Sequence, residues 1–561
     1  MSRVVKCPSV GKVTLTDADY LSSGGEAEVF VKGGLAYKLY HDPSKMISKT
    51  KMKELSILSS KKNIITPKQV IYDVRDNPIG FTMDFIKNTE PLIKLFSNGF
   101  KKKNGLGDMA INEVVEKVQS TLEFIHKNKI LVVDLNELNL LVSENFNDVN
   151  FIDVDSYQTQ SAKATAIMAS VRDPLVKNNN WDTGSDWFSF AVLAFQMWIG
   201  SHPYKGNHPK YKRKEWTKRM LDGVSVFDPD SSLPKMCNDF SVIPPSHYQW
   251  MEAVFQKRCR SAPPQIGEAS VVILTKKNVV IVNKSFDLSL LCTAPADLLD
   301  CYDVMGVKYF VARDGIYKDN ALLPIDISNT KKVLFSPGTG FAPVVAKLKN
   351  DLLAFYNLSG KEFARISATD MTTRNNIIYS VNGDQLYENT FKVRNGRDIH
   401  EFRAVCNIMP NSSRVFDGVI LQTMLKKQFA VIPYEKGKCS IINLKELSGS
   451  MVIDAKCERN ILVILAAKDG LYHRYIFTFD EKYKTYTYSL EEDVVMTDVN
   501  FTVLPNGLAV MATESNVVMF KGDMEKQIPN APFTADNKLF NLSGKVHYID
   551  GKNIYQASVK K

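Results

Sequence analysis

The sequence divides into two halves with different periodicity, and this change limits the possible folds more than any other feature. Before about residue 264, segments with helical spacing alternate with short strand-like segments. After it, helical spacing almost disappears and strand-like pairs separated by turns take over. The junction Arg260–Pro264 ends in two prolines, which stop a helix. We therefore expect two domains: residues 1–264, which mix helices and strands (α+β), and residues 265–561, which are all β.

The elements expected in the first half follow from apolar spacing. Gly33 and Gly34 can form a tight turn between two strands, and the helix near residue 190 is apolar on most sides, which predicts burial all round. The expected strands are 29–31, 36–40, 79–85, 139–142 and 149–153, and the expected helices are 46–59, 111–127 and 187–199.

The second half repeats strand pairs, as in 308–317, 376–387, 462–472, 507–520 and 545–555. Most of the later spacings are about 40 to 45 residues, the length of a four-stranded propeller blade. At that period the region predicts a β-propeller of about six or seven blades. The last strand-like segment, Asn553–Ser558, lies almost at the C-terminus, where it could close a ring. A repeated two-sheet β structure is the alternative.

Composition places the chain among globular proteins. Hydrophobic residues make up 44% and charged residues 24%, which excludes disorder as the main state. The eight cysteines form no Cys-x-x-Cys pair and no zinc pattern, and they suit a reducing compartment. We expect no signal peptide and no membrane span. The net charge of +10 comes with basic clusters such as Lys101–Lys103, which are read as a solvated face.

One motif carries chemistry. A helix predicted to end near Lys127 leads to Asp134, and Asn139 follows five residues later. Such an Asp can orient an acceptor hydroxyl, and the amide oxygen of such an Asn can bind Mg²⁺. Downstream, Phe151-Ile152-Asp153-Val154-Asp155 offers a carboxylate that can bridge metal and phosphates. Asp153 fits that role best, and Asp155 is a second candidate that would share or replace it.

These segments resemble the protein kinase family over about residues 15–262. The residues that carry the resemblance are the loop 132–139, here called the Asp134 loop, and the Asp153 segment, which stands at the position of the kinase Asp-Phe-Gly motif. Two segments are most similar to an atypical, bacterial and phage-type branch of the family. They are the short hairpin at residues 21–29, which would approach the phosphates, and the Asp-x-Asp-Ser-Tyr-Gln segment at residues 153–158. The resemblance implies a bilobal domain, with an N-lobe of about residues 1–86 and a C-lobe of 87–264, that binds ATP and Mg²⁺.

The resemblance also implies roles for residues before the Asp134 loop. Lys38 matches the strand lysine that grips the phosphates, with Glu54 on the next helix as its partner. The backbone of a glycine-rich turn would approach the phosphates of ATP. The backbone of a second segment, the hinge, would lie beside the adenine ring. The turn residues are Ser22, Gly24, Gly25, Ala27 and Val29, and the hinge residues are Met83, Asp84 and Phe85.

The sequence departs from the family on the substrate side. Val132 and Val133 replace the usual His and Arg, so we expect no activation by the usual loop phosphorylation. Asn136 replaces a Lys that contacts the transferred phosphate in Ser/Thr kinases. The Ala-Pro-Glu segment is reduced to Asp173–Leu175 and loses its Glu. Asp186, which leads the buried helix, is expected to anchor the Asp134 loop through its backbone, as in the family.

Two functions stay open at this point. The first is an ATP- and Mg²⁺-dependent kinase that acts on protein Ser or Thr, with the propeller recruiting substrate or another protein. The second is a non-catalytic pseudokinase scaffold or structural assembly protein. Nucleic-acid binding rests on the basic clusters alone. The Lys- and Asn-rich composition is typical of an AT-rich genome such as that of a phage, which would place the protein in the host cytoplasm or in the virion.

Overall fold

The computed structural model describes residues 2–164, 167–267, 285–337, 343–424, 427–514, 516–522, 524–529 and 531–560. By their contacts the residues form two compact units. Unit 1 comprises Met1–Val280 together with Ala467–Tyr472 and Glu492–Asp498. Unit 2 comprises Ile281–Ala466, His473–Glu491 and Val499–Lys561.

Unit 1 begins with a seven-stranded sheet in the order β2-β1-β6-β7-β5-β4-β3. The strands are β1 (Arg3–Cys7), β2 (Gly11–Leu15), β3 (Tyr20–Ser23), β4 (Ala27–Lys32), β5 (Leu35–Tyr40), β6 (Gln69–Tyr72) and β7 (Pro78–Asp84). The hairpin predicted from Gly33 and Gly34 is confirmed: β4 and β5 pair antiparallel, and both glycines have positive φ.

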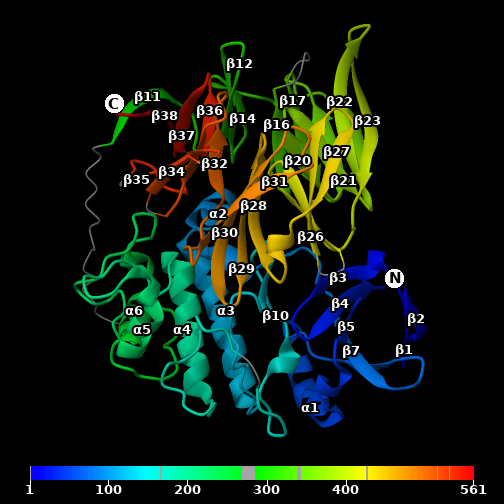
Figure 1. Ribbon diagram of the computed structural model, residues 1–561, viewed down its shortest axis with the longest axis vertical. Helices are drawn as coiled ribbons and strands as arrows, with labels where there is room; N and C mark the ends of the chain where they lie inside the picture. Colours follow the sequence, from blue (N-terminus) through cyan, green and yellow to red (C-terminus); the bar gives the residue numbers. More distant parts are fainter. Residues whose placement is uncertain are drawn as a thin grey trace. The chain divides into compact units, whose positions relative to one another are not determined.

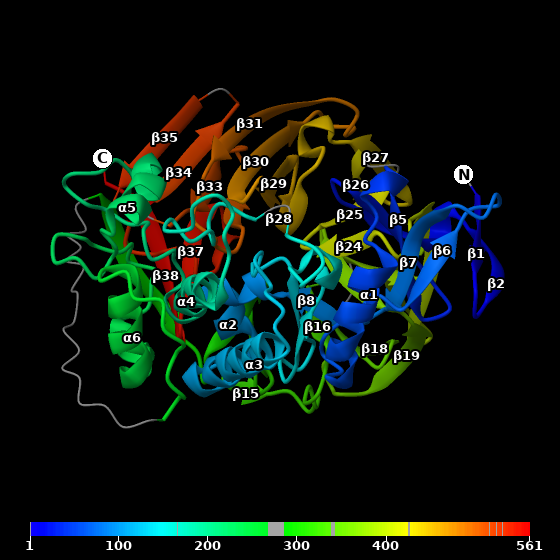
Figure 2. The ribbon, with the colours of Figure 1, turned by 90° about the horizontal axis from the view of Figure 1, so that it is seen from below.

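The helix expected over 46–59 is shorter than predicted. Helix α1 spans Lys49–Leu55 and continues as a 3₁₀ turn, Ser56–Ser60. It begins late because the Ser48 side chain accepts a hydrogen bond from the Lys51 amide and caps the helix. Met52 of α1 packs with Val70 and Phe81 of the sheet. Figure 2 shows α1 next to β7 of this sheet.

The rest of unit 1 is mainly helical. A small sheet in the order β10-β9-β8 contains β8 (Thr89–Pro91), β9 (Leu140–Ser143) and β10 (Val149–Phe151). The helices are α2 (Asn98–Asn104), α3 (Asp108–Lys127), α4 (Thr183–Ile199), α5 (Trp216–Asp222) and α6 (Pro245–Phe255), and α3 packs against α4 (Figure 1). Every α4 residue from Gly184 to Ile199 is buried, as the apolar pattern predicted.

Unit 2 is built from four-stranded sheets, and many of their strands are labelled in Figure 1. Seven such sheets are assigned within the described residues, and one of them also includes residues of the two segments that belong to unit 1. Six contain strands that are consecutive in the chain. The seventh joins β11 (Phe286–Thr293) to the last three strands, and β11 pairs antiparallel with β38 (Asn553–Val559) from Phe286–Val559 to Thr293–Asn553. The first and last described strands of the unit therefore share one sheet.

The remaining strands are grouped here by sheet. They are β12 (Leu298–Val304), β13 (Val307–Ala312), β14 (Ile316–Lys318) and β15 (Ala321–Leu322); β16 (Lys332–Ser336), β17 (Val344–Lys349), β18 (Leu352–Tyr356) and β19 (Glu362–Ser367); β20 (Asp370–Arg374), β21 (Ile377–Asn382), β22 (Gln385–Arg394) and β23 (Arg397–Asn407); β24 (Ser413–Phe416), β25 (Val419–Met424), β26 (Lys427–Glu435) and β27 (Lys438–Asn443); β28 (Met451–Glu458), β29 (Ile461–Lys468), β30 (Leu471–Phe479) and β31 (Tyr486–Glu492); β32 (Asn500–Val503), β33 (Ala509–Ala512), β34 (Asn516–Lys521) and β35 (Met524–Pro529); and β36 (Leu539–Leu542) with β37 (Lys545–Asp550) beside β38. No described helix is both long and apolar enough to cross a membrane.

The buried face of α4 generates a stability prediction. The Phe195 ring is fully buried and lies 5.7 Å from Phe227, 6.2 Å from Phe240 and 5.9 Å from Phe255, centroid to centroid. Phe195→Ala should lower the free energy of unfolding by about 3–5 kcal/mol, through lost burial and a cavity. Urea unfolding measures this. Leu221→Ala, at a 59% exposed side chain, is the control, and an equal loss in both variants would contradict the packing.

Candidate active site

A buried lysine joins the seven-stranded sheet to the segment after β10. The Lys38 ammonium, on β5, lies 2.6 Å from Asp153 Oδ1 and 2.8 Å from both carboxylate oxygens of Asp155. Tyr40, on the same strand, donates a hydrogen bond of 2.7 Å to Asp155 Oδ2. The Asp155 side chain is 5% exposed and that of Asp153 is 39% exposed. Asp155 is therefore enclosed by its partners, whereas Asp153 also faces the solvent side of the site.

Electrostatics fix the charge state of this cluster. Burial alone would lower the pKa of Lys38, but the carboxylates of Asp155 and Asp153 raise it well above its ordinary value. Burial and the Asp155 carboxylate raise the pKa of Tyr40, so its phenol remains a hydrogen-bond donor. Lys38 is thus a permanent cation at the centre of the cluster.

A second lysine approaches Asp155 from α1. The Lys51 ammonium is buried and donates a hydrogen bond of 2.7 Å to the Asp155 backbone carbonyl. Burial lowers the pKa of Lys51, and the nearby Lys38 charge acts in the same direction. The helix that was expected to supply a carboxylate to this site therefore supplies an ammonium.

The predicted pairing of Lys38 with Glu54 is wrong in this structure. Within the described residues, Lys38 pairs with Asp153 and Asp155, and the Glu54 carboxylate instead accepts a hydrogen bond of 2.7 Å from Ser161 Oγ. Glu54 lies in the last turn of α1, which ends at Leu55. Because α1 is short and Lys51 occupies the position beside Asp155, Glu54 is left at the edge, within reach of the segment around Ser161.

The Asp134 loop brings its two predicted polar side chains together. The Asn139 amide nitrogen lies 3.1 Å from the Asp134 carbonyl and 3.4 Å from Asp134 Oδ2. Since the nitrogen faces Asp134, the amide oxygen of Asn139 faces away from it. Asn136 shapes the turn between them, because its Oδ1 accepts hydrogen bonds from the Leu138 and Asn139 amides.

Asp134 has a further contact on its other oxygen. Its Oδ1 accepts a hydrogen bond of 2.8 Å from the Met168 backbone amide. Burial raises the pKa of Asp134, although the Met168 hydrogen bond opposes this shift. A raised pKa makes a carboxylate a better proton acceptor, as a residue that orients or deprotonates a hydroxyl requires.

Asp186 holds the Asp134 loop in place, which confirms its predicted structural role. Its carboxylate is fully buried and accepts hydrogen bonds of 2.9 Å from the Val132 amide and 2.8 Å from the Val133 amide. It also lies 2.8 Å from His126 Nε2, at the end of α3. Val133 has φ of 65°, a conformation that β-branched residues rarely adopt, so this anchor offsets local strain.

Asp153 also has a left-handed backbone, with φ of 57° and ψ of 32°. The Ser156 amide and hydroxyl both donate to its carbonyl, at 3.0 and 2.7 Å. Asp tolerates this conformation better than most residues. The resulting turn carries Asp153 and Asp155 to the same ammonium.

The predicted phosphate turn and hinge are in the expected elements. Gly24 and Gly25 lie in the turn between β3 and β4, where the Gly24 amide donates to the Ala27 carbonyl at 2.9 Å. A Cβ at Gly25 would meet open space, so its backbone is accessible to a ligand. Ser22 and Val29 pair across the two strands. Met83 and Asp84 end β7, and Phe85 follows with its amide 3.4 Å from the Gly34 carbonyl.

The reduced segment at 173–175 keeps an acidic anchor that the sequence reading had missed. Both oxygens of the buried Asp173 pair with Arg260, at 2.6 and 2.7 Å. The guanidinium also lies 4.6 Å from the centre of the Phe188 ring on α4. A bidentate pair of this kind is geometrically specific, so the segment is tied to the helical part of unit 1.

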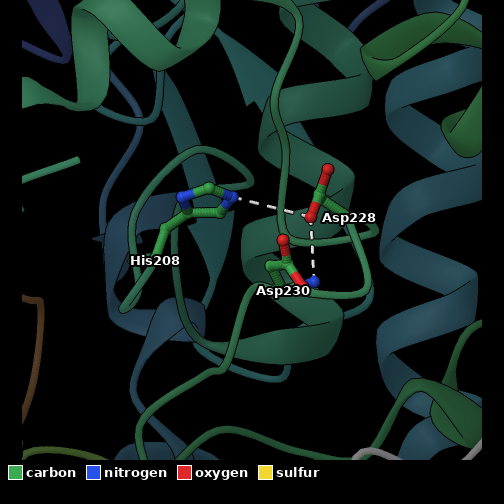
Figure 3. A group of neighbouring side chains, drawn as sticks. All are labelled: His208, Asp228 and Asp230. Atoms are coloured by element: carbon green, nitrogen blue, oxygen red, sulfur yellow. Dashed lines mark hydrogen bonds and ion pairs between the residues drawn. The ribbon is translucent and has the colours of Figure 1, made fainter. Parts of the chain in front are cut away.

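A different group of three side chains has metal-binding types (Figure 3). It contains His208, Asp228 and Asp230. The Lys210 amide donates to His208 Nδ1 at 3.1 Å, so the proton of the neutral ring lies on Nε2, which is 3.5 Å from Asp228 Oδ1. The Asp230 amide donates to that same oxygen at 2.9 Å. Because neither ring nitrogen offers a free lone pair, we read this group as a hydrogen-bonded turn.

Comparison with known proteins identifies a protein kinase domain. Residues 35–260 match the family model "Protein kinase domain"; the match begins at Leu35, after the glycine-rich turn. The inhibitor of nuclear factor kappa-B kinase subunit beta of Rattus norvegicus is 24% identical over 194 residues, 31% of this chain and 25% of that protein. The serine/threonine-protein kinase PknF of Mycobacterium tuberculosis is 21% identical over 145 residues, 24% of this chain and 30% of that protein.

The chain thus spans 25–30% of the length of these two curated relatives. Among solved structures, the Cydia pomonella granulovirus kinase PK-1 aligns with a TM-score of 0.33 and 13% identity, covering 42% of this chain and 86% of that chain.

Sequence reasoning missed four residues of the site. Tyr40 and Lys51 contact Asp155, Met168 contacts Asp134, and His126 contacts Asp186. For Tyr40 a signal existed, since its side chain points to the same face of β5 as that of Lys38, two residues earlier. Met168 acts through its backbone, which side-chain identity does not reveal.

Asp186 generates a test of the loop anchor. Asp186→Asn places an amide NH₂ against a backbone N–H donor and leaves that donor unpaired. We expect the free energy of unfolding, measured in urea, to fall by about 3 kcal/mol. Asp182→Ala, which removes only the cap of the same helix, is the control and should cost about 1 kcal/mol. Equal losses would show that the Asp186 contacts add nothing beyond helix capping.

Proposed function

We propose that this protein is an ATP- and Mg²⁺-dependent phosphotransferase that transfers the γ-phosphate to Ser or Thr hydroxyls of proteins. The observation that supports this most is the convergence of Lys38, Asp134, Asn139 and Asp153 from separate elements of the kinase domain. The Asp153 carboxylate enters the electrostatics of both Lys38 and Asp134. Phosphoryl transfer needs a cation for the phosphates, oxygen ligands for Mg²⁺ and a carboxylate at the acceptor, and this set offers all three.

Each residue then has a role. Lys38 neutralises the phosphates, and the turn at Gly24 and Gly25 approaches them through its backbone. Asn139 would supply its amide oxygen and Asp153 its carboxylate to Mg²⁺, a hard cation that prefers oxygen. Asp134 orients the acceptor hydroxyl and takes its proton. The acceptor must displace or bypass the Met168 amide, which occupies one oxygen of Asp134.

We propose that Asp155 is an anchor for Lys38 rather than a metal ligand. Both of its oxygens contact the Lys38 ammonium, one also accepts from Tyr40, and the side chain is almost fully enclosed. Asp153 is more exposed and contacts Lys38 through one oxygen, which leaves the carboxylate better placed for a metal. In this arrangement Asp155 is the carboxylate partner of Lys38, the role that had been expected of Glu54.

We also propose that unit 2 is a seven-bladed β-propeller that binds a protein partner or the substrate. Each four-stranded sheet would be one blade, and β11 would complete the blade formed by β36, β37 and β38. A closed ring leaves only short protected edges and offers loops at two rims for partners. A non-catalytic scaffold that only binds nucleotide is the competing function, and the departures at Val132, Val133 and Asn136 favour it.

Nucleotide binding and phosphoryl transfer are tested separately on the full chain. ATP with Mg²⁺ at about 100 times its Kd should stabilise the wild type by about 2.7 kcal/mol, measured as a thermal shift. Asp153→Ala should lose this stabilisation, whereas Asp148→Ala, an exposed residue between β9 and β10, should keep it.

Autophosphorylation with labelled ATP completes that test. Asp134→Asn should bind ATP normally and lose transfer by about 10³-fold or more, because the acceptor carboxylate is removed. If the wild type binds ATP but transfers no phosphate to itself or to added protein, the scaffold function is correct. If Asp134→Asn transfers as well as the wild type, the assigned role of Asp134 is wrong.

The roles of the two neighbouring carboxylates also separate experimentally. Asp155→Asn should raise KM for ATP about tenfold, because Lys38 loses its bidentate partner, and should leave the Mg²⁺ concentration for half-maximal activity unchanged. Asp153→Asn should raise that Mg²⁺ requirement. Kinetics over a Mg²⁺ series give both values. A raised Mg²⁺ requirement in Asp155→Asn would restore the metal role first expected for this residue.

A further inference from the structure

The Asp134 loop of unit 1 is contacted by residues from far along the chain. The segments 467–472 and 492–498 belong to the same compact unit as the kinase domain. They lie outside the matched region, which ends at residue 260. The two segments are linked to each other, because the Val494 amide donates to the Tyr472 carbonyl at 2.9 Å.

Glu137 is the residue of the Asp134 loop that meets these segments. Its side chain is fully buried, and its Oε1 accepts a hydrogen bond from the Tyr472 hydroxyl. Its Oε2 is buried with no hydrogen-bond partner among the described residues. A buried carboxyl is costly without a donor, so Tyr472 satisfies a group that the loop cannot satisfy by itself.

Glu137 is also placed so that its position matters for chemistry. It lies between Asn136, which shapes the loop, and Asn139, whose amide faces Asp134. Its own carbonyl accepts a hydrogen bond of 3.3 Å from the Ile93 amide. A shift of Glu137 therefore changes the backbone between Asp134 and Asn139.

The same segment reaches the other side of Asp134. Gly470 has φ of 76°, and a Cβ there would lie 2.8 Å from Met168 Cγ. Met168 is the residue whose amide occupies Asp134 Oδ1. Gly470 therefore lies close to Met168, which contacts Asp134, and Tyr472 contacts Glu137, which lies in the Asp134 loop.

Charged contacts fix the segments within the unit. Lys205 lies 2.5 Å from Asp493 Oδ1, and Trp216 Nε1 donates to Asp493 Oδ2 at 3.1 Å. The Lys205 ammonium is also 6.0 Å from the centre of the Tyr472 ring. The hydroxyl of Ser97 donates to Asp498 Oδ1 at 2.7 Å. The partners of these contacts are half-buried or buried, which makes the pairs stronger than surface ion pairs.

We propose that Tyr472 is a positioning residue for phosphoryl transfer, which it supports by holding Glu137 and hence the spacing of Asp134 and Asn139. This inference rests on the proposed function. It assigns to residues 467–472 a part in the kinase reaction, although they lie outside the matched kinase domain. Tyr472 acts through its hydrogen bond to Glu137 in the Asp134 loop.

The test compares full-length Tyr472→Phe with Tyr475→Phe, a buried tyrosine on the same strand. Amide hydrogen exchange across residues 134–139 should become about tenfold faster in Tyr472→Phe and remain unchanged in Tyr475→Phe. Exchange in α3 should stay as in the wild type. Glu137→Gln, which keeps an oxygen acceptor for the tyrosine, should preserve most of the protection.

Kinetics then separate positioning from simple stabilisation. Tyr472→Phe should lower kcat about tenfold with less than about a twofold change in KM for ATP, measured per folded molecule. If Tyr472 only stabilised the fold, Tyr472→Phe would lower the melting temperature and leave this kcat unchanged. If Tyr472→Phe does not fold, Asp493→Asn, which loosens the linked segment at Lys205 and Trp216, serves as the second variant.

The two proposals fail in different ways. Equal exchange and equal kcat in Tyr472→Phe and Tyr475→Phe would overturn the role of Tyr472, whatever the reaction. Hydrogen exchange needs neither ATP nor an acceptor. Suppose that exchange is faster in Tyr472→Phe and that the wild type transfers no phosphate. The contact of Tyr472 with the Asp134 loop would then be supported, whereas its role in phosphoryl transfer and the proposed function would both be overturned.

Discussion

The Lys38 ammonium is the contact on which the site depends. It is buried, and a buried cation is tolerated only with close, well-placed carboxylates, which Asp153 and Asp155 provide. Lys38 belongs to the seven-stranded sheet and the two acids to the segment after β10, so this ion cluster joins the sheet to that segment within unit 1. The cluster also sets the charge that a phosphate would meet. Removing one acid would leave part of the positive charge of the buried Lys38 and Lys51 side chains uncompensated.

The strained backbone around the cluster follows from this requirement. Asp153 turns through a left-handed conformation so that two acids of one short segment reach one ammonium. Val133 adopts positive φ before Asp134 and is held there by the buried Asp186. Such strain persists only where surrounding contacts over-determine the local structure. The carboxylate of Asp186 and the ammonium of Lys38 thus act in the same way, each fixing one side of the same site.

The sequence predicted those parts of the site that depend on local spacing. Asp134, Asn139 and Asp153 stand in short loops next to predictable elements, and the hairpin of β4 and β5 and the buried α4 follow from glycine placement and apolar pattern. The partner of Lys38 was not predictable in this way. It depends on where α1 begins and ends, and the Ser48 cap together with the end at Leu55 places Lys51 beside Asp155 and leaves Glu54 to Ser161. The register of α1, to within one helical turn, therefore decides whether a carboxylate or an ammonium lies beside Asp155.

The contact between Glu137 and Tyr472 shows a different limit. The two residues are 335 positions apart, and no local pattern around either one indicates the other. A glutamate in a polar loop reads as a surface residue, yet this one is fully buried and accepts a hydrogen bond from a tyrosine far along the chain. The sequence pattern changes near residue 264, while the compact unit that contains the matched residues 35–260 also includes residues 467–472 and 492–498. Since a buried carboxyl is costly without a donor, the buried position of Glu137 in the Asp134 loop depends on a residue from the later part of the chain.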